Sequence, residues 1–267
     1  MNGQTCLVLR PLTILILCSF FIFSNLSTQA AGRGQLGILD TSGVNPNTGR
    51  NWVIGDQYRL VFISSERVDP TKSSFGSMND IATWNAIAQS FANKSNLNLG
   101  KANWKVIGST KDVDARDNTQ TNPALNGLGH PIMLIDGSTI VARNYADLWD
   151  GRLENTITMT EKRGASIKDL QVSAFPYTGT GPNGRAVPSK EVLRALSPSS
   201  KEKIRQGFAN HPAGWIDRNT VGPPATDNAP MPIYVMSDAL YVVDEIPEFA
   251  STWLIGLAGL ALLRRRR

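Results

Sequence analysis

The clearest hydrophobic period in the chain is helical and lies over residues 79–95. Apolar residues recur there every three or four positions, so they share one face of a helix. They are Ile81, Trp84, Ala88, Phe91 and Ala92. Asn79 stands at the start of this segment, where its side chain can cap the first N–H groups. We therefore expect one amphipathic helix that packs its apolar face on a core.

Short β-rich runs surround this helix. Residues 57–64 are apolar at both odd and even positions, which is typical of a central strand covered on both faces. Residues 131–143 predict a hairpin, because Asp136 and Gly137 suit a tight turn with positive φ. Further short strands are expected over residues 104–107, 157–159, 233–236 and 240–243.

The remaining segments are rich in turn-forming residues. Residues 31–50, 176–188 and 210–232 read as loops, with Trp215 as the anchor of the last one. Between them, two short helices are expected. One is capped by Ser189 and carries Val192, Leu193 and Leu196; the other has a capping box of Ser199 and Glu202 and carries Ile204 and Phe208. No repeat and no low-complexity linker divides residues 31–246, so we expect one α+β domain.

The N-terminus reads as a secretory signal peptide over residues 1–30. Arg10 precedes an apolar segment, residues 12–23, and Ala30 offers a small residue before the cleavage site. Twelve helical residues span only about 18 Å, too little for a bilayer core of about 30 Å. Both cysteines, Cys6 and Cys18, lie in this segment, so the mature chain is expected to be free of cysteine.

The C-terminus combines a helix breaker, a short apolar segment and a basic end. Pro247 and Glu248 precede the apolar residues 249–263. The last four residues are Arg264, Arg265, Arg266 and Arg267. Because positive charge stays on the cytoplasmic side of a membrane, these arginines would leave the domain on the outer side. Fifteen helical residues are about 22 Å long, short for a permanent anchor.

The charge balance argues against nucleic-acid binding. The chain of 267 residues has a formal charge of +5, with 27 basic and 22 acidic residues. Arg10 and the four terminal arginines account for five of the basic residues, and Glu248 for one acidic residue. The domain between them, with 22 basic and 21 acidic residues, is nearly neutral. No basic face is therefore expected, and no nucleic-acid partner.

Catalytic motifs are scarce. The sequence has no Gly-x-Ser-x-Gly elbow, and His130 and His211 are its only histidines. Asp147, Asp150 and Glu154 lie close in sequence and could serve as the paired carboxylates of a glycosidase. A secreted carbohydrate-active hydrolase that uses such Asp/Glu pairs is therefore the alternative interpretation. We expect no catalytic residue and a protein that is not an enzyme.

Two kinds of binding residue are candidates. Asp112, Asp114, Asp117 and Asn118 carry the oxygen ligands that calcium prefers, although their spacing departs from an EF-hand loop, and no other cofactor is expected. Tyr145 and Trp149, with Tyr177 and the neighbouring Asp150, would contact a sugar ring if they are exposed.

The C-terminal pattern resembles the PEP-CTERM sorting signal of Gram-negative bacteria. Pro247 with Glu248, the apolar run around Trp253 and the arginine cluster carry the resemblance, and Phe249 stands where the family usually has a second proline. The resemblance implies recognition by an exosortase-type transpeptidase, transient insertion of residues 249–263 into the inner membrane and cleavage near Pro247.

The domain resembles bacterial surface domains with a C-type-lectin-like or endostatin-like fold. Residues 60–65, 113–118, 131–161 and 173–183, with the helix around Trp84 and the late strand over residues 240–244, carry this resemblance. It implies an α+β fold with short strands, one long helix and long loops. Together the patterns predict an exported, non-catalytic protein of the cell envelope, cell surface or extracellular matrix, with loops available for a glycan, such as exopolysaccharide, or for a protein partner.

Overall fold

The computed structural model describes residues 32–162, 165–168, 174–188, 190–197, 203–218 and 229–244. The predicted signal peptide with Ala30, and the sorting signal with Pro247, Glu248 and Arg264 to Arg267, lie outside these residues. Within the described ranges, no helix is both long enough and apolar enough to span a bilayer.

The described residues form a seven-stranded mixed sheet with short helices, an α+β fold. The strands are β1 (Arg33–Gly34), β2 (Gln57–Ile63), β3 (Trp104–Val106), β4 (Ile132–Leu134), β5 (Ile140–Ala142), β6 (Tyr234–Ser237) and β7 (Leu240–Val243). The helices are α1 (Ile81–Asn93), α2 (Ala115–Asn118), α3 (Pro123–Asn126) and α4 (Tyr145–Leu148), with 3₁₀ turns η1 (Leu99–Lys101) and η2 (Pro212–Gly214). The helix expected over residues 79–95 is α1, and every predicted strand except residues 157–159 is present, with Met159 forming one isolated bridge to Ser166.

Strand β2 is the centre of the sheet. One edge pairs with β4 in parallel, and the other pairs antiparallel with β7 near its start and β6 near its end. Tyr58 faces Leu240 and Val61 faces Met236, so the three residues 237–239 on the β6–β7 side stand opposite the two residues 59–60 on β2. One extra residue between β6 and β7 therefore forms a bulge, which lets a single bent ribbon follow β2.

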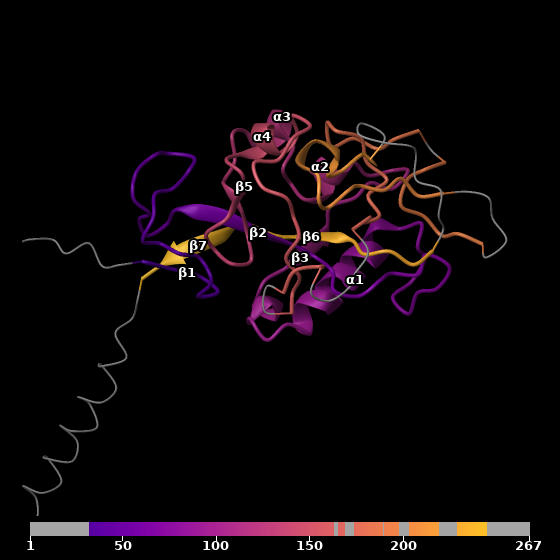
Figure 1. The fold of residues 1–267 in the computed structure, drawn as a ribbon, viewed down its shortest axis with the longest axis horizontal. Coiled ribbons are helices and arrows are strands. Elements are labelled where there is room, and N and C mark those ends of the chain that lie inside the picture. The colour runs from indigo at the N-terminus through magenta and orange to yellow at the C-terminus, as the bar shows by residue number, and fades with distance from the viewer. Residues whose placement is uncertain are drawn as a thin grey trace, which may run out of the picture.

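Both faces of the sheet are covered, as the apolar odd and even positions of β2 predict. Tyr58, Leu60 and Phe62 belong to the core under α1, whereas Val61 and Ile63 belong to the core on the opposite face. Figure 1 shows α1 on one side of the sheet and α2, α3 and α4 on the other. The opposite core contains α4 and parts of the long segments between β5 and β6, such as Ile157 and Trp215, whereas other parts of these segments belong to the core under α1, so buried side chains hold them on both faces.

The hairpin of β4 and β5 forms as expected. Gly137 has a φ of +75°, which a side chain would disfavour, and its N–H donates to the carbonyl of Leu134. The carboxylate of Asp136 accepts from the backbone N–H groups of Ser138 and Thr139. The turn therefore uses both residues that the sequence pattern singled out.

Three expectations of local structure need correction. The N-cap of α1 is Asp80, whose side chain accepts from the N–H of Ala82, and not Asn79. Residues 190–197 and 203–208 are not helical; the expected caps Ser189, Ser199 and Glu202 lie outside the described residues. The loop expected over residues 31–50 contains β1, which pairs with β7.

The non-helical path of residues 190–197 and 203–208 has a physical cause in their backbone hydrogen bonds. The N–H of Leu193 donates to the carbonyl of Ser109, and the N–H of Arg205 donates to the carbonyl of Glu191. The first bond joins residues 190–197 to the loop after β3, and the second joins residues 203–208 to residues 190–197, so both stretches are held by bonds other than those of a helix. Val192, Leu193, Leu196 and Ile204 are buried all the same, which is why their spacing resembled an amphipathic helix.

Candidate functional site

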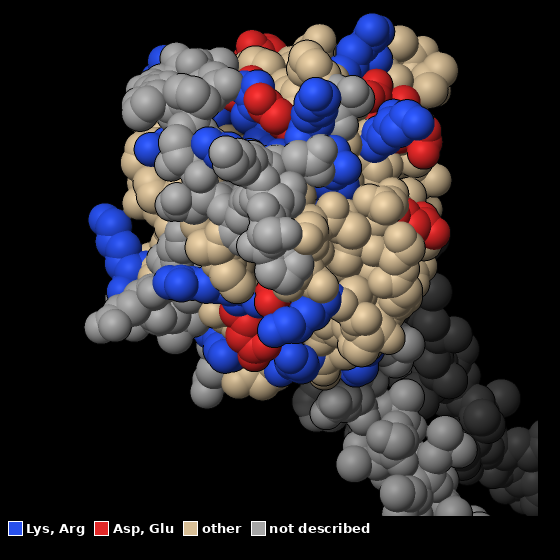
Figure 2. All heavy atoms as spheres, turned by 90° about the vertical axis from the view of Figure 1, so that its right-hand side faces the viewer, with Lys and Arg blue, Asp and Glu red and all other residues tan. Residues whose placement is uncertain are grey.

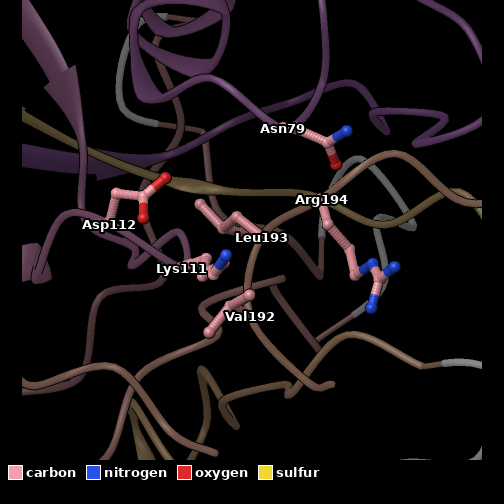
Figure 3. A pocket seen from close by; sticks show the side chains of 6 residues that line it. All are labelled: Asn79, Lys111, Asp112, Val192, Leu193 and Arg194. Atoms are coloured by element: carbon pink, nitrogen blue, oxygen red, sulfur yellow. The ribbon is translucent and has the colours of Figure 1, made fainter. Parts of the chain in front are cut away.

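A groove lies at the N-terminal end of α1. One hollow, of about 290 Å³, is lined by Asn79, Lys111, Asp112, Val192, Leu193 and Arg194 (Figure 3). A second, of about 230 Å³, also contacts Asn79 and Asp112 and adds Ser77, Asp80, Ile81, Thr110 and Val113. The two hollows adjoin each other at Asn79 and Asp112, and we call the pair the α1 groove.

The start of α1 forms one wall of the α1 groove. Asp80 caps the helix, and the side-chain oxygen of Asn79 accepts from the backbone N–H of Ala195 over 3.0 Å. This bond joins the helix start to the segment that carries Val192, Leu193 and Arg194. Asn79, which the sequence suggested as the helix cap, instead fixes the width of the groove.

Hydrogen bonds and ion pairs hold residues 190–197 against neighbouring segments of the domain. Leu193 N donates to Ser109 O over 2.8 Å, and Leu196 N donates to Pro70 O over 3.1 Å. The guanidinium of Arg205 pairs with the carboxylate of Glu191 and, over 3.0 Å, with that of the buried Asp217. The groove is therefore lined by backbone that several long-range contacts hold in place.

The lining combines charge with an apolar floor. Asn79 and Arg194 lie on one side, Lys111 and Asp112 lie on the other, and Val192 and Leu193 lie between them (Figure 3). Lys111 and Asp112 are exposed and make no ion pair with any described residue. Amides, a carboxylate and cations above an apolar floor suit non-covalent binding of a polar ligand. Among the described residues of the lining, Ser77 and Thr110 carry hydroxyl groups, and neither hydroxyl is hydrogen-bonded to Asp80 or Asp112.

The aromatic residues predicted to contact a ligand are buried. Tyr145 is 3% exposed and Trp149 is 7% exposed, and Tyr177 is fully buried. Trp149 Nε1 donates to the carbonyl of Thr121, and its ring lies 5.7 Å from that of Trp215. The condition of exposure is not met, because Tyr145 and Trp149 fill the core on one face of the sheet and Tyr177 fills the core under α1. Inside the core, the polar atoms of Trp149 and Tyr177 donate hydrogen bonds to backbone carbonyl groups.

The acidic residues of the same segment are engaged in local contacts. Asp147 accepts from the backbone N–H of Arg143 over 2.6 Å, and Glu154 pairs with the side chain of Arg143 over 2.5 Å. Asp150 is exposed and accepts from the backbone N–H of Arg152 over 2.8 Å. Arg143 therefore neutralises the region between Asp147 and Glu154, which does not favour an acid–base pair of the glycosidase type.

The two histidines lie apart in different environments. His130 packs edge-on against Tyr145, and burial, followed by the charge of Arg59, lowers its pKa below 6.5. His211 stacks on Phe208 at a ring distance of 6.3 Å. Neither histidine is hydrogen-bonded to a serine side chain in the part of the chain that the structure describes, so no triad forms there.

The acidic residues proposed for calcium do not converge. Asp112 lines the α1 groove, whereas Asp114 accepts from Ala186 N over 2.7 Å. Asp117 accepts from the side chain of Asn122, and Asn118 pairs with the side chain of Asn85. Across the described residues, no group of three or more His, Cys, Asp or Glu side chains is placed to hold a metal ion.

Two buried charged residues were not singled out from the sequence. Arg59 is 3% exposed and donates to the hydroxyl of Tyr145 and the carbonyl of Ser237. Glu161 is 1% exposed and accepts from the backbone N–H and the hydroxyl of Ser65, and burial raises its pKa. Arg59 could have been recognised from the sequence, because it is an arginine within an otherwise apolar strand. Nothing comparable in the sequence marks Glu161 as buried. Both residues support the fold and neither reaches the groove.

Charges of both signs are interspersed on the face shown in Figure 2, in agreement with the near-neutral composition of the domain. No model of a known protein family matches this sequence, and a comparison with curated proteins finds no match either.

Proposed function

We propose that the protein is exported and sorted to the cell envelope, cell surface or extracellular matrix of a Gram-negative bacterium, where its domain binds a partner without catalysis. Signal peptidase removes residues 1–30, and an exosortase-type transpeptidase acts on the C-terminal segment that begins with Pro247 and Glu248. The four terminal arginines hold the end of the chain on the cytoplasmic side while the domain folds outside.

The pairing of β1 with β7 is the observation that supports this proposal. Arg33 faces Val243 and Gly34 faces Val242 in an antiparallel pair (Figure 1). The two ends of the domain therefore leave it side by side, at the same end of the sheet. Both predicted cleavage sites lie a few residues beyond this pair, so trimming at either end leaves the core intact.

The short link after β7 agrees with sorting at a membrane. Residues 244–248 join β7 to the apolar segment that starts at Phe249. Five extended residues reach at most about 18 Å. While residues 249–263 are inserted, the β1–β7 end of the domain thus lies close to the membrane, whereas α1 lies toward the opposite end of the domain (Figure 1).

We further propose that the domain is a variant of the C-type-lectin-like architecture. A mixed sheet, the 13-residue helix α1 beside three helices of 4 residues, and the long segments between β5 and β6, with little regular structure, support this proposal. The architecture presents loops on a rigid sheet, which suits a binding protein better than the described polar residues suit an enzyme.

Fractionation of cells that carry an exosortase tests the sorting proposal. Replacement of Arg264 to Arg267 by alanine is expected to abolish delivery to the cell surface, because the charge that stops translocation is lost. Replacement by lysine keeps the charge and is the matched control, expected to behave as the natural chain. Equal surface delivery of the alanine variant would refute a role for the arginine cluster.

A further inference from the structure

We propose that the α1 groove binds a saccharide that bears carboxylate groups, with Lys111 holding the carboxylate. This inference deepens the proposed function, because it names the ligand of an exported binding protein. The residues that line the groove support this inference, and binding can be tested independently of sorting.

Lys111 is the cation best placed to meet a ligand. Its side chain is exposed at the groove, and it forms no ion pair with any described residue. The N-terminal end of α1 forms the neighbouring wall, where the carboxylate of Asp80 already accepts from the N–H of Ala82, so the helix end adds no further site for an anion. A carboxylate that enters here gains a charge-assisted hydrogen bond without displacing an internal partner of Lys111.

The other polar groups match hydroxyls. Asp112 is exposed and makes no ion pair in the described part of the chain, so its carboxylate is free to accept hydrogen bonds. The oxygen of Asn79 is used by Ala195 N, whereas its amide NH₂ group donates to no described residue. The groove thus offers a cation for a carboxylate, an acceptor for hydroxyl groups and a donor for hydroxyl oxygens.

The size of the groove suits a sugar ring. Val192 and Leu193, which are 2% and 1% exposed, close the floor between the two polar sides, so a ring would meet mainly the polar groups at those sides. The hollows of about 290 and 230 Å³ together fall in the range of small-ligand sites, roughly 300–1,000 Å³. They exceed what a single inorganic anion needs.

In the first hollow, two cations, Lys111 and Arg194, stand against one carboxylate, Asp112, so its charge favours an acidic over a neutral saccharide; Asp80 lies in the second hollow. Sites for neutral sugars gain much of their binding energy from aromatic rings, and none of the described residues that line the two hollows is aromatic. Without that contribution, the ionic contact at Lys111 becomes the main source of affinity. The rigid backing of residues 190–197 means that little entropy is lost when the ligand enters.

The experiment is a calorimetric titration of the purified protein with trigalacturonate, whose three rings each carry a carboxylate, and with its neutral methyl ester. We expect binding of the acid and at least tenfold weaker binding of the ester. Lys111→Met is expected to weaken binding of the acid about tenfold, and Lys111→Arg, which keeps the charge, only slightly. Added salt is expected to weaken binding as well.

Lys101→Met is the matched control. Lys101 is an exposed lysine at the opposite end of α1, about 20 Å away by the length of the helix, so its loss should leave binding unchanged. No binding of trigalacturonate, equal binding of the ester, or equal losses from Lys101→Met and Lys111→Met would overturn the inference. A chain that binds the acid but is not sorted would refute the sorting proposal alone, and a sorted chain that does not bind would refute this inference alone.

Discussion

Arg59 Nε donates a hydrogen bond to the hydroxyl of Tyr145 over 2.9 Å, inside the core between β2 and α4. The guanidinium also donates to the carbonyl of Ser237, and no described carboxylate forms an ion pair with it. A buried charge of this kind depends on neutral acceptors, so each acceptor contributes to the stability of the fold.

Tyr145→Phe therefore removes an acceptor from a buried cation. We expect the free energy of unfolding to fall by about 1–3 kcal/mol, the cost of leaving a buried donor unsatisfied. Tyr241→Phe, at an exposed tyrosine on β7, is the control and should change stability by less than about 0.5 kcal/mol. Urea unfolding measures both; equal effects would show that the Arg59 contact is unimportant.

Glu161 gives a prediction for the pH dependence of stability. Burial raises its pKa above the ordinary 4.5, so the folded chain holds this proton more tightly than the unfolded chain. The free energy of unfolding contributed by Glu161 thus falls as pH rises from about 4.5 through the folded pKa. Glu161→Gln should flatten this decline, and Glu66→Gln, at an exposed neighbour of Ser65, should leave it in place. An unchanged slope in Glu161→Gln would contradict the assignment.

His130 predicts the opposite change of stability with pH. Its folded pKa is lowered below 6.5, mainly by burial and then by Arg59, so the unfolded chain binds this proton more tightly. Stability from this residue is complete above pH 6.5 and is lost as pH falls from 6.5 through the folded pKa. An NMR titration of the two histidines should show one imidazole that titrates below 6.5 and disappears in His130→Gln. A midpoint at or above 6.5 would count against this environment.

A substitution at Gly179 tests how closely the residues that line the groove are packed against the loop after β3. Its φ is +61°, and a Cβ atom there would lie 2.5 Å from Leu193 N and 2.7 Å from Ser109 O. Gly179→Ala must shift the segment that carries the groove floor. Gly49→Ala is the control, because Gly49 has a similar φ of +69° but open space around it. Both variants pay about 1–2 kcal/mol for the left-handed backbone.

We expect Gly179→Ala to lose a further 1–3 kcal/mol, roughly the cost of overpacking, and to weaken binding of trigalacturonate. Thermal unfolding of the two variants measures the difference. Equal unfolding temperatures of the two variants would mean that residues 190–197 can move without loss of stability. That result would contradict the long-range contacts described for this segment.

The regular elements could be predicted because their patterns are local. The apolar face of α1, the apolar positions of β2 and the Asp136–Gly137 turn can each be recognised from a short run of consecutive residues. The β6–β7 bulge could not be predicted, because it depends on the register of β2, which is distant in sequence. Strand β1 has only two residues and gives no period to detect.

The groove was also beyond the reach of sequence patterns. Its lining comes from the start of α1, the loop after β3 and residues 192–194, and long-range hydrogen bonds alone bring these together. Val192, Leu193 and Leu196 suggested a helix because buried loop residues and a helix face can share a spacing. Trp149 and Tyr145 suggested a sugar site because aromatic side chains near acidic ones serve cores as well as surfaces.

Mass spectrometry of the mature protein, purified from the surface of the producing cell, tests the account most directly. The account predicts a first residue at Ala31 and a last residue near Pro247, with the domain between them complete. An intact surface form that retains the tryptic fragment containing Trp253, or a full-length chain in the cytosol with residues 1–30 attached, would contradict it.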